Sequence, residues 1–158
     1  MSDRVPMTPG GYQKLKDDLH QLKTVERYEN VKEIEEARAH GDISENAEFH
    51  AAKEKQAHIE GRIRMLEDKI ARAQIIDPSQ QGSDKVRFGT TVVLSDTESG
   101  EEVTYRIVGE DESDVAEGLI SITSPVARAL LGKEVDDEVK VRVPKGTREF
   151  EVLEIRAE

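Results

Sequence analysis

Cysteine is absent from this chain of 158 residues. Its absence excludes disulfides, thiolate nucleophiles, iron–sulfur clusters and cysteine-ligated zinc. Tryptophan is also absent, and aromatic residues make up only 4% of the sequence. No stretch reaches the roughly 18 consecutive apolar residues of a membrane-spanning helix. The first residues lack the apolar run of a signal peptide, so we expect a cytoplasmic protein.

The net charge of −11 comes from 23 basic and 34 acidic residues, and it is uneven along the chain. Residues 79–158 carry a net charge of −8 and residues 1–78 a net charge of −3. A protein that binds duplex DNA by itself usually has the opposite sign. We therefore expect any contact with nucleic acid to be local, or arranged by a partner protein.

The composition changes at residues 77–83, where proline, glycine and serine cluster and the apolar periodicity stops. This pattern is typical of a linker. It predicts two domains, 1–78 and 79–158. The first domain has apolar residues at helical intervals of three and four, and the second is rich in Val, Ile and Thr.

The first half has the apolar spacing of two long helices joined near Gly41. One helix is predicted over 8–40, with Thr8 as its N-cap, and the other over 44–76, capped by Ser44. Apolar residues recur at intervals of three and four, as in a coiled-coil seam. The predicted seam positions are Tyr12, Leu15, Leu19, Leu22, Val25, Tyr28, Val31, Ile34 and Ala37 in the first helix, and Phe49, Ala52, Gln56, Ile59, Ile63, Leu66, Ile70 and Ala73 in the second. The result is an antiparallel hairpin reaching roughly 45 Å.

The second half predicts an antiparallel sheet with one short helix, so the fold class is α+β. The helix is predicted over 126–131, where Ser124 caps it, Pro125 opens it and Gly132 ends it. The strand candidates are 86–95, 103–108, 119–122, 139–143 and 150–155.

The turn of the hairpin holds three carboxylates at intervals of three residues, Asp42, Glu45 and Glu48. Carboxylates are oxygen ligands that suit Mg²⁺, but two of them cannot complete its octahedral shell. The tip could therefore complete another enzyme's metal site. The same residues also fit a simpler role, because acidic side chains stabilise a helix N-terminus and Asp42 and Glu45 have capping-box spacing.

The tip sequence from Arg38 to Glu54, RAHGDISENAEFHAAKE, resembles the signature of the bacterial Gre transcript cleavage factors. The resemblance continues in the second half at VRFGTTV, TYRIVG and ITSPVAR and so covers nearly the whole chain. It implies a coiled-coil hairpin followed by a sheet domain similar in fold to FKBP. It also implies a factor that binds RNA polymerase as a monomer and is not an enzyme by itself.

By this resemblance the hairpin enters the secondary channel of the polymerase, where backtracked RNA protrudes by its 3′ end. Asp42 and Glu45 would stimulate cleavage of that RNA by the polymerase, helping to hold a Mg²⁺ shared with its active site. The resemblance also implies that Arg38 and Lys53 contact the RNA and that Ser124, Pro125 and Arg128 lie near the polymerase contact. The simpler alternatives are that Arg38 and Lys53 are only solvated surface residues and that Ser124 is only a helix cap.

Two other functions are compatible with the sequence. One is a Gre-like inhibitor that occupies the same channel without promoting cleavage, although such relatives depart at the tip, where Asp42 and Glu45 match here. The other is a coiled-coil adaptor whose acidic tip only caps a helix. Prolyl isomerase activity is rejected, because fold alone does not carry function and the second half has few aromatic residues to line a pocket.

Overall fold

The computed structural model describes residues 4–42 and 46–157. The described chain divides into two compact units, one of residues 12–72 and the other of residues 4–11 together with 73–157. The units thus place residues before Gly11 with the second half of the chain, whereas the sequence assigned them to the first. As a division into domains, 1–78 and 79–158 stays a prediction.

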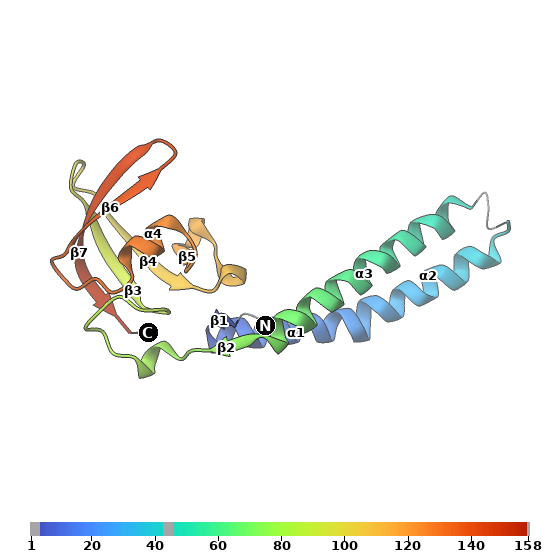
Figure 1. The fold of residues 1–158 in the computed structure, drawn as a ribbon. Helices are drawn as coiled ribbons and strands as arrows, with labels where there is room; N and C mark the ends of the chain where they lie inside the picture. The colour runs from blue at the N-terminus through green and yellow to red at the C-terminus, as the bar shows by residue number, and fades with distance from the viewer. Residues whose placement is uncertain (1–3, 43–45, 158) are drawn as a thin grey trace. The chain divides into compact units, whose positions relative to one another are not determined.

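The first unit contains the predicted helical hairpin (Figure 1). Its outgoing arm consists of α1 (Pro9–Gln21), the π-helical turn η1 (Leu22–Glu26) and α2 (Arg27–Ala39). Its returning arm is α3 (Ala47–Ala71), whose 25 residues span about 37 Å. Leu22, Ile59, Ile63 and Leu66 form the buried cluster between the arms, with Leu15 and Leu19 packed against it.

The predicted seam is correct up to Leu22 and wrong just beyond it. Val25, Tyr28 and Val31 are 37%, 60% and 43% exposed, and Asn30, which was not predicted, is buried instead; the predicted seam position Ala37 is again buried. The cause is η1, because a π-helical turn takes more residues than an α-helical one and shifts the contact line by about one residue. A count that assumes one continuous α-helix over 8–40 cannot show this shift.

The second helix is shorter than the sequence predicts. It ends at Ala71, and Ala73–Ile75 forms the strand β2, which pairs in parallel with β1 (Val5–Met7). Backbone pairing continues past the strands, since the Ile76 amide donates to the Met7 carbonyl at 2.9 Å. Met7 is 2% exposed, so burial of this side chain accompanies the pairing.

A buried threonine ties the N-terminal segment to the second half of the chain. Thr8 caps α1 as predicted, because its hydroxyl accepts from the Gly11 amide at 3.1 Å. Glu112 accepts hydrogen bonds from the Thr8 hydroxyl, from the Thr8 amide at 3.2 Å and from the Gly109 amide at 3.1 Å. One carboxylate therefore receives three donors, which explains why this segment groups with residues beyond 73.

The other unit is built on a five-stranded sheet with the order β5-β4-β3-β7-β6 (Figure 1). These strands are β3 (Thr91–Asp96), β4 (Glu102–Val108), β5 (Leu119–Ser121), β6 (Glu138–Val143) and β7 (Gly146–Arg156). The predicted α+β class is confirmed. The sheet is mixed, however, since β5 pairs in parallel with β4. The antiparallel prediction missed this because short 3-10 turns, Glu110–Glu112 and Val115–Glu117, carry the chain across to the edge of β4.

The short helix α4 (Pro125–Leu130) packs on this sheet through Ala127 and Leu130, both fully buried. Phe150 and Leu94 are the largest buried side chains of the same core. Ser124 accepts from the Ala127 amide at 3.2 Å, and Pro125 occupies the first helical turn, as predicted. The core therefore holds α4 and its cap in a defined place.

The π-helical turn makes a testable difference between two neighbouring apolar residues. Leu22→Ala removes a side chain that is 2% exposed and should destabilise the hairpin by about 2–4 kcal/mol. Val25→Ala should change stability by less than about 0.5 kcal/mol, because η1 turns Val25 outward. Urea unfolding followed by far-ultraviolet circular dichroism measures both. Equal losses would contradict the shifted contact line.

Candidate functional site

The outgoing arm of the hairpin ends in a turn that only glycine adopts easily. The His40 amide donates to the Ala37 carbonyl at 3.2 Å and closes the last turn of α2. Gly41 follows with φ of +135°, a conformation that side chains disfavour. Asp42 follows directly after this reversal and is exposed.

The returning arm begins at Asn46. Its side-chain oxygen accepts from the Phe49 amide at 3.0 Å, so Asn46 is the N-cap of α3. The sequence predicted Ser44 for this role, and Ser44 lies outside the described residues. The Asn46 side-chain nitrogen also donates to the Ala37 carbonyl at the end of α2. One amide side chain therefore contacts both arms.

Asp42 lies beside other polar side chains at the tip. It lines a shallow hollow of about 430 Å³ together with His40, Asn46, Ala47 and Glu48. Its predicted partner Glu45 lies outside the described residues, so the structure does not test the Asp42–Glu45 pair. Glu48, the third carboxylate of the turn, stands in the first turn of α3. A carboxylate is stabilised there by the positive end of the helix dipole, in line with the helix-capping alternative for these acidic residues.

Arg38 and Lys53 both lie near the tip, on the same side of the hairpin. The Arg38 guanidinium carbon lies over the Phe49 ring, 5.8 Å from its centroid, and Lys53 follows Phe49 by one turn of α3. The Lys53 ammonium donates to the Gln56 side chain at 2.8 Å. Within the described residues neither cation forms an ion pair, so both remain available for an anionic partner.

Two cations further along the hairpin, Arg27 and Lys23, are paired with carboxylates of the facing arm. Arg27 forms two hydrogen bonds to Glu60, at 2.7 and 2.9 Å, and Lys23 pairs with Glu67 at 3.0 Å. The hydrogen bond from Arg27 lowers the pKa of the Glu60 carboxyl and raises the pKa of the guanidinium. Arg38 and Lys53 therefore differ from Arg27 and Lys23, which are paired with carboxylates of the facing arm.

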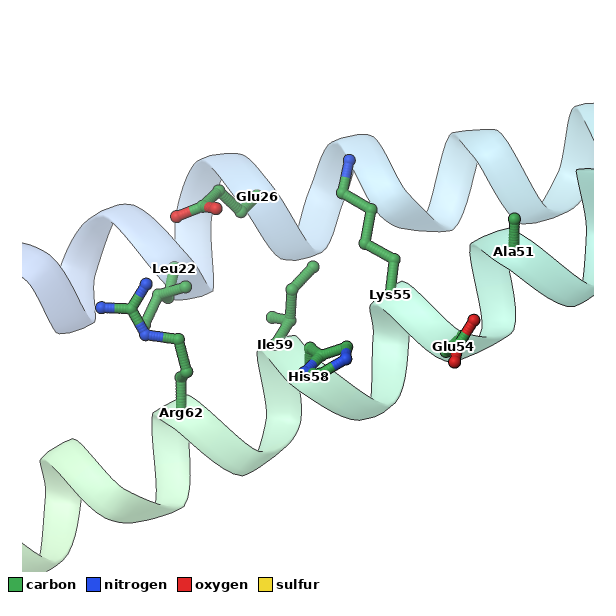
Figure 2. Close-up of a pocket in the computed structure, with 8 residues that line it drawn as sticks. All are labelled: Leu22, Glu26, Ala51, Glu54, Lys55, His58, Ile59 and Arg62. Atoms are coloured by element: carbon green, nitrogen blue, oxygen red, sulfur yellow. The ribbon is translucent and has the colours of Figure 1, made fainter.

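The opposite side of the hairpin carries a groove that the sequence did not reveal. The groove has a volume of about 540 Å³. Figure 2 shows that side chains from both arms line it. Its lining residues are Leu22, Glu26, Ala51, Glu54, Lys55, His58, Ile59 and Arg62. Lys55 crosses to Glu33 at 2.8 Å, and this hydrogen bond raises the lysine pKa. The sequence could have indicated this groove only through His58 and Arg62, whose spacing of four residues places them on one face of the helix.

The predicted docking residues lie at α4. Ser124 has a clear structural task as the N-cap, whereas Pro125 and Arg128 are exposed. The structure therefore bears out the capping role of Ser124 and leaves the docking role as a prediction. Arg128 is the better probe of docking, since its side chain is not part of the cap.

No group of three or more histidine and acidic side chains is placed to hold a metal ion within residues 4–42 and 46–157. In the same ranges, no helix has both the length and the apolar character to cross a membrane.

Comparison with known proteins identifies the class of the chain. The family profile for the N-terminal part of transcription elongation factors GreA and GreB matches residues 5–75, and the profile for their C-terminal part matches residues 80–157. The transcription elongation factor GreA of Anaeromyxobacter sp. (strain K) is 60% identical, with 96% of this chain and 92% of that protein covered. GreA of Hyphomonas neptunium is 56% identical, with 97% and 98% covered. Among solved structures, the GreA factor homolog Gfh1 of Thermus thermophilus is 34% identical, with 97% and 99% covered and a TM-score of 0.44.

The matched profiles define a transcription elongation factor. The chain belongs to the GreA/GreB family, and the relatives above are similar to it over nearly their full length. The predicted function is confirmed at this level. The chain is a factor that stimulates transcript cleavage by RNA polymerase and is not an enzyme by itself.

Proposed function

We propose that the hairpin carries Asp42 and Glu45 into the active site of RNA polymerase, where they help to hold a Mg²⁺ beside backtracked RNA. The observation that carries this proposal is the position of Asp42. Asp42 is exposed and lies between the two arms of a hairpin whose returning helix spans about 37 Å. A turn at the end of a long, narrow support can reach a site that a globular domain cannot enter.

The donor chemistry of the tip fits a shared ion. Carboxylate oxygens are hard ligands that suit Mg²⁺, and two of them leave most of its six positions to other donors. When bound, the ion would stabilise negative charge on the attacking and leaving oxygens of the phosphodiester.

The chain's own contribution is to position groups and to accept a proton. The Asp42 and Glu45 carboxylates would orient an attacking water by hydrogen bonding, and a carboxylate oxygen so placed can take its proton as a general base. Arg38 and Lys53 would hold the phosphates of the RNA 3′ segment, since both are cations without carboxylate partners among the described residues. The factor would act as a monomer, in the cytoplasm where the polymerase works.

The acidic surface of the whole molecule is compatible with this local contact. Residues 79–158 carry most of the net charge of −11, and they are the half proposed to dock on the polymerase rather than on RNA. Docking would use Pro125 and Arg128 on α4, whose placement is fixed by the buried Ala127 and Leu130. Negative charge on the remaining surface disfavours non-specific binding to nucleic acid.

Asp42→Asn and Glu45→Gln test the proposed role of the two tip carboxylates. Each change keeps size and removes charge, so binding to RNA polymerase should persist while stimulated cleavage falls roughly 10–100-fold. The measurement is shortening of radiolabelled RNA from its 3′ end in stalled elongation complexes. Unchanged cleavage by both variants would rule out metal delivery. Binding and channel occupancy without any cleavage by the wild-type chain would favour an inhibitor.

Arg38→Ala and Lys53→Ala test contact with the RNA backbone. Each should weaken stimulation to a similar degree for RNAs of different sequence, because phosphate contacts carry no sequence information. Each should also reduce the salt slope of stimulation by about one unit, the contribution of one phosphate contact. Arg62→Ala is the matched control, since Arg62 lines the groove on the opposite side. An equal effect of the control would show that charge alone matters.

Arg128→Ala tests docking through α4 without disturbing its cap. If Arg128 contacts the polymerase, affinity should fall by more than about fivefold, as is common for an interface arginine. Far-ultraviolet circular dichroism should show an unchanged fold. Arg142→Ala on β6 is the control, because Arg142 is also exposed and basic. Competition with a fluorescently labelled wild-type factor gives both affinities. Equal affinities for the two variants would contradict docking at Arg128.

A further inference from the structure

The Asn46 side chain forms two hydrogen bonds of different kinds. Its oxygen accepts from the Phe49 amide, within the first turn of α3, and its nitrogen donates to the Ala37 carbonyl, in the last turn of α2. The orientation of the amide follows from these partners, since an amide proton requires the oxygen and a carbonyl requires the nitrogen. The two contacts therefore depend on asparagine specifically.

Capping a helix needs only the first of these contacts. Elsewhere in the chain the N-caps Ser124 and Asp77 accept from a backbone amide two or three residues on, at 3.2 and 3.0 Å. The Asn46 bond to Ala37 adds nothing to the cap of α3. It instead satisfies a carbonyl that the end of α2 leaves without a full set of intrahelical partners.

The Ala37 carbonyl is the point where both ends of the tip loop meet. It accepts from the His40 amide at 3.2 Å and also from Asn46. Only residues 41–45 lie between these two donors, and Gly41 makes the first reversal. In the sequence, Asp42 is two residues after one donor and Glu45 immediately precedes the other.

We propose that Asn46 is a positioning residue for transcript cleavage, which holds the end of α2 against the start of α3 and so sets the placement of Asp42. This inference rests on the proposed role of Asp42 and Glu45. Catalysis of this kind is sensitive to placement, since a displacement of about 1 Å can cost roughly a hundredfold in rate. A cap alone would stabilise α3 and leave the loop ends unconnected.

A second asparagine provides an internal control. Asn30 is 2% exposed and donates from α2 to the Ala52 carbonyl of α3 at 3.0 Å. It thus makes the reciprocal connection across the same two helices, seven residues before Ala37. Its loss should affect the stability of the hairpin but not the placement of the loop, so the two asparagines separate stability from positioning.

The experiment compares Asn46→Asp, Asn46→Ser and Asn30→Leu with the wild-type chain. Aspartate and serine both keep an acceptor for the Phe49 amide. Aspartate places an oxygen against the Ala37 carbonyl, and the single serine oxygen cannot replace an amide that contacts both helices at once. Serine adds no charge, so agreement between the two variants excludes an effect of charge at the tip.

We expect both Asn46 variants to bind RNA polymerase with affinity within about twofold of wild type and to stimulate cleavage roughly 10–100-fold less. The Mg²⁺ concentration for half-maximal stimulation should rise by about threefold or more, because misplaced carboxylates hold the shared ion less well. Asn30→Leu should lower the thermal midpoint without changing the Mg²⁺ requirement.

A measurement on the free factor adds a readout independent of cleavage. By NMR, the order parameters of the Gly41 and Asp42 amides should fall in both Asn46 variants, while the Phe49 amide keeps its protection from exchange. Loss of protection at Phe49 would show that the variants damage the cap and would overturn the positioning role.

The remaining outcomes separate the two proposals. Wild-type cleavage rates and Mg²⁺ dependence in both Asn46 variants would overturn the inference and leave the proposed function standing. A loss in Asn46→Asp alone would overturn it as well, since charge would then be the cause. If Asp42→Asn and Glu45→Gln, run beside them, stimulate cleavage as the wild type does, the proposed function fails and the inference fails with it.

Discussion

Burial of one apolar contact line between two helices is the constraint on which the hairpin depends. The large buried side chains lie far from the tip; they are Leu22, Ile59, Ile63 and Leu66. Towards the tip the buried positions become small or polar, namely Ala37, Ala52 and Asn30. Apolar burial per residue is lower there, so directional hydrogen bonds take over the task of fixing the two helices. Near the tip, hydrogen bonds therefore fix the two helices more than apolar burial does. Because hydrogen bonds are directional, they suit a region that presents side chains at defined places.

Charge pairing divides the hairpin in a similar way. Arg27 and Lys23 are held by carboxylates on the facing arm, whereas Arg38 rests on an aromatic ring and Lys53 on a neutral amide. Exposed ion pairs contribute little to stability, so the main effect of this pairing is to neutralise positive charge that could otherwise bind nucleic acid. An acidic protein can thereby offer a small basic surface near its tip and remain repulsive to nucleic acid elsewhere.

Local signals in the sequence predicted most of the fold. The caps Thr8 and Ser124, the two-arm hairpin and most of the strand segments follow from spacing and turn chemistry, which act over a few residues. The strand predicted over 86–95 begins only at Thr91, because residues 86–90 form a turn instead. The π-helical turn at Leu22–Glu26, the pairing of Val5–Met7 with Ala73–Ile75 and the bridging role of Asn46 could not be predicted this way. Each depends on contacts between distant segments or on a small change in helix phase. At the site, Arg38 and Lys53 were identified through a family resemblance, and only the structure shows that they differ from Arg27 in lacking a carboxylate partner among the described residues.

The pairing of β1 with β2 has a consequence for how the chain matures during synthesis. Val5–Met7 is synthesised before its partner Ala73–Ile75 and the carboxylate of Glu112, which follow only after the whole hairpin has been made. The hairpin joins segments that are near in sequence, so it can close early, and its closure shortens the effective loop between β1 and β2. A closed hairpin would therefore bring the two strands together at a lower entropic cost than an unstructured connection of the same number of residues.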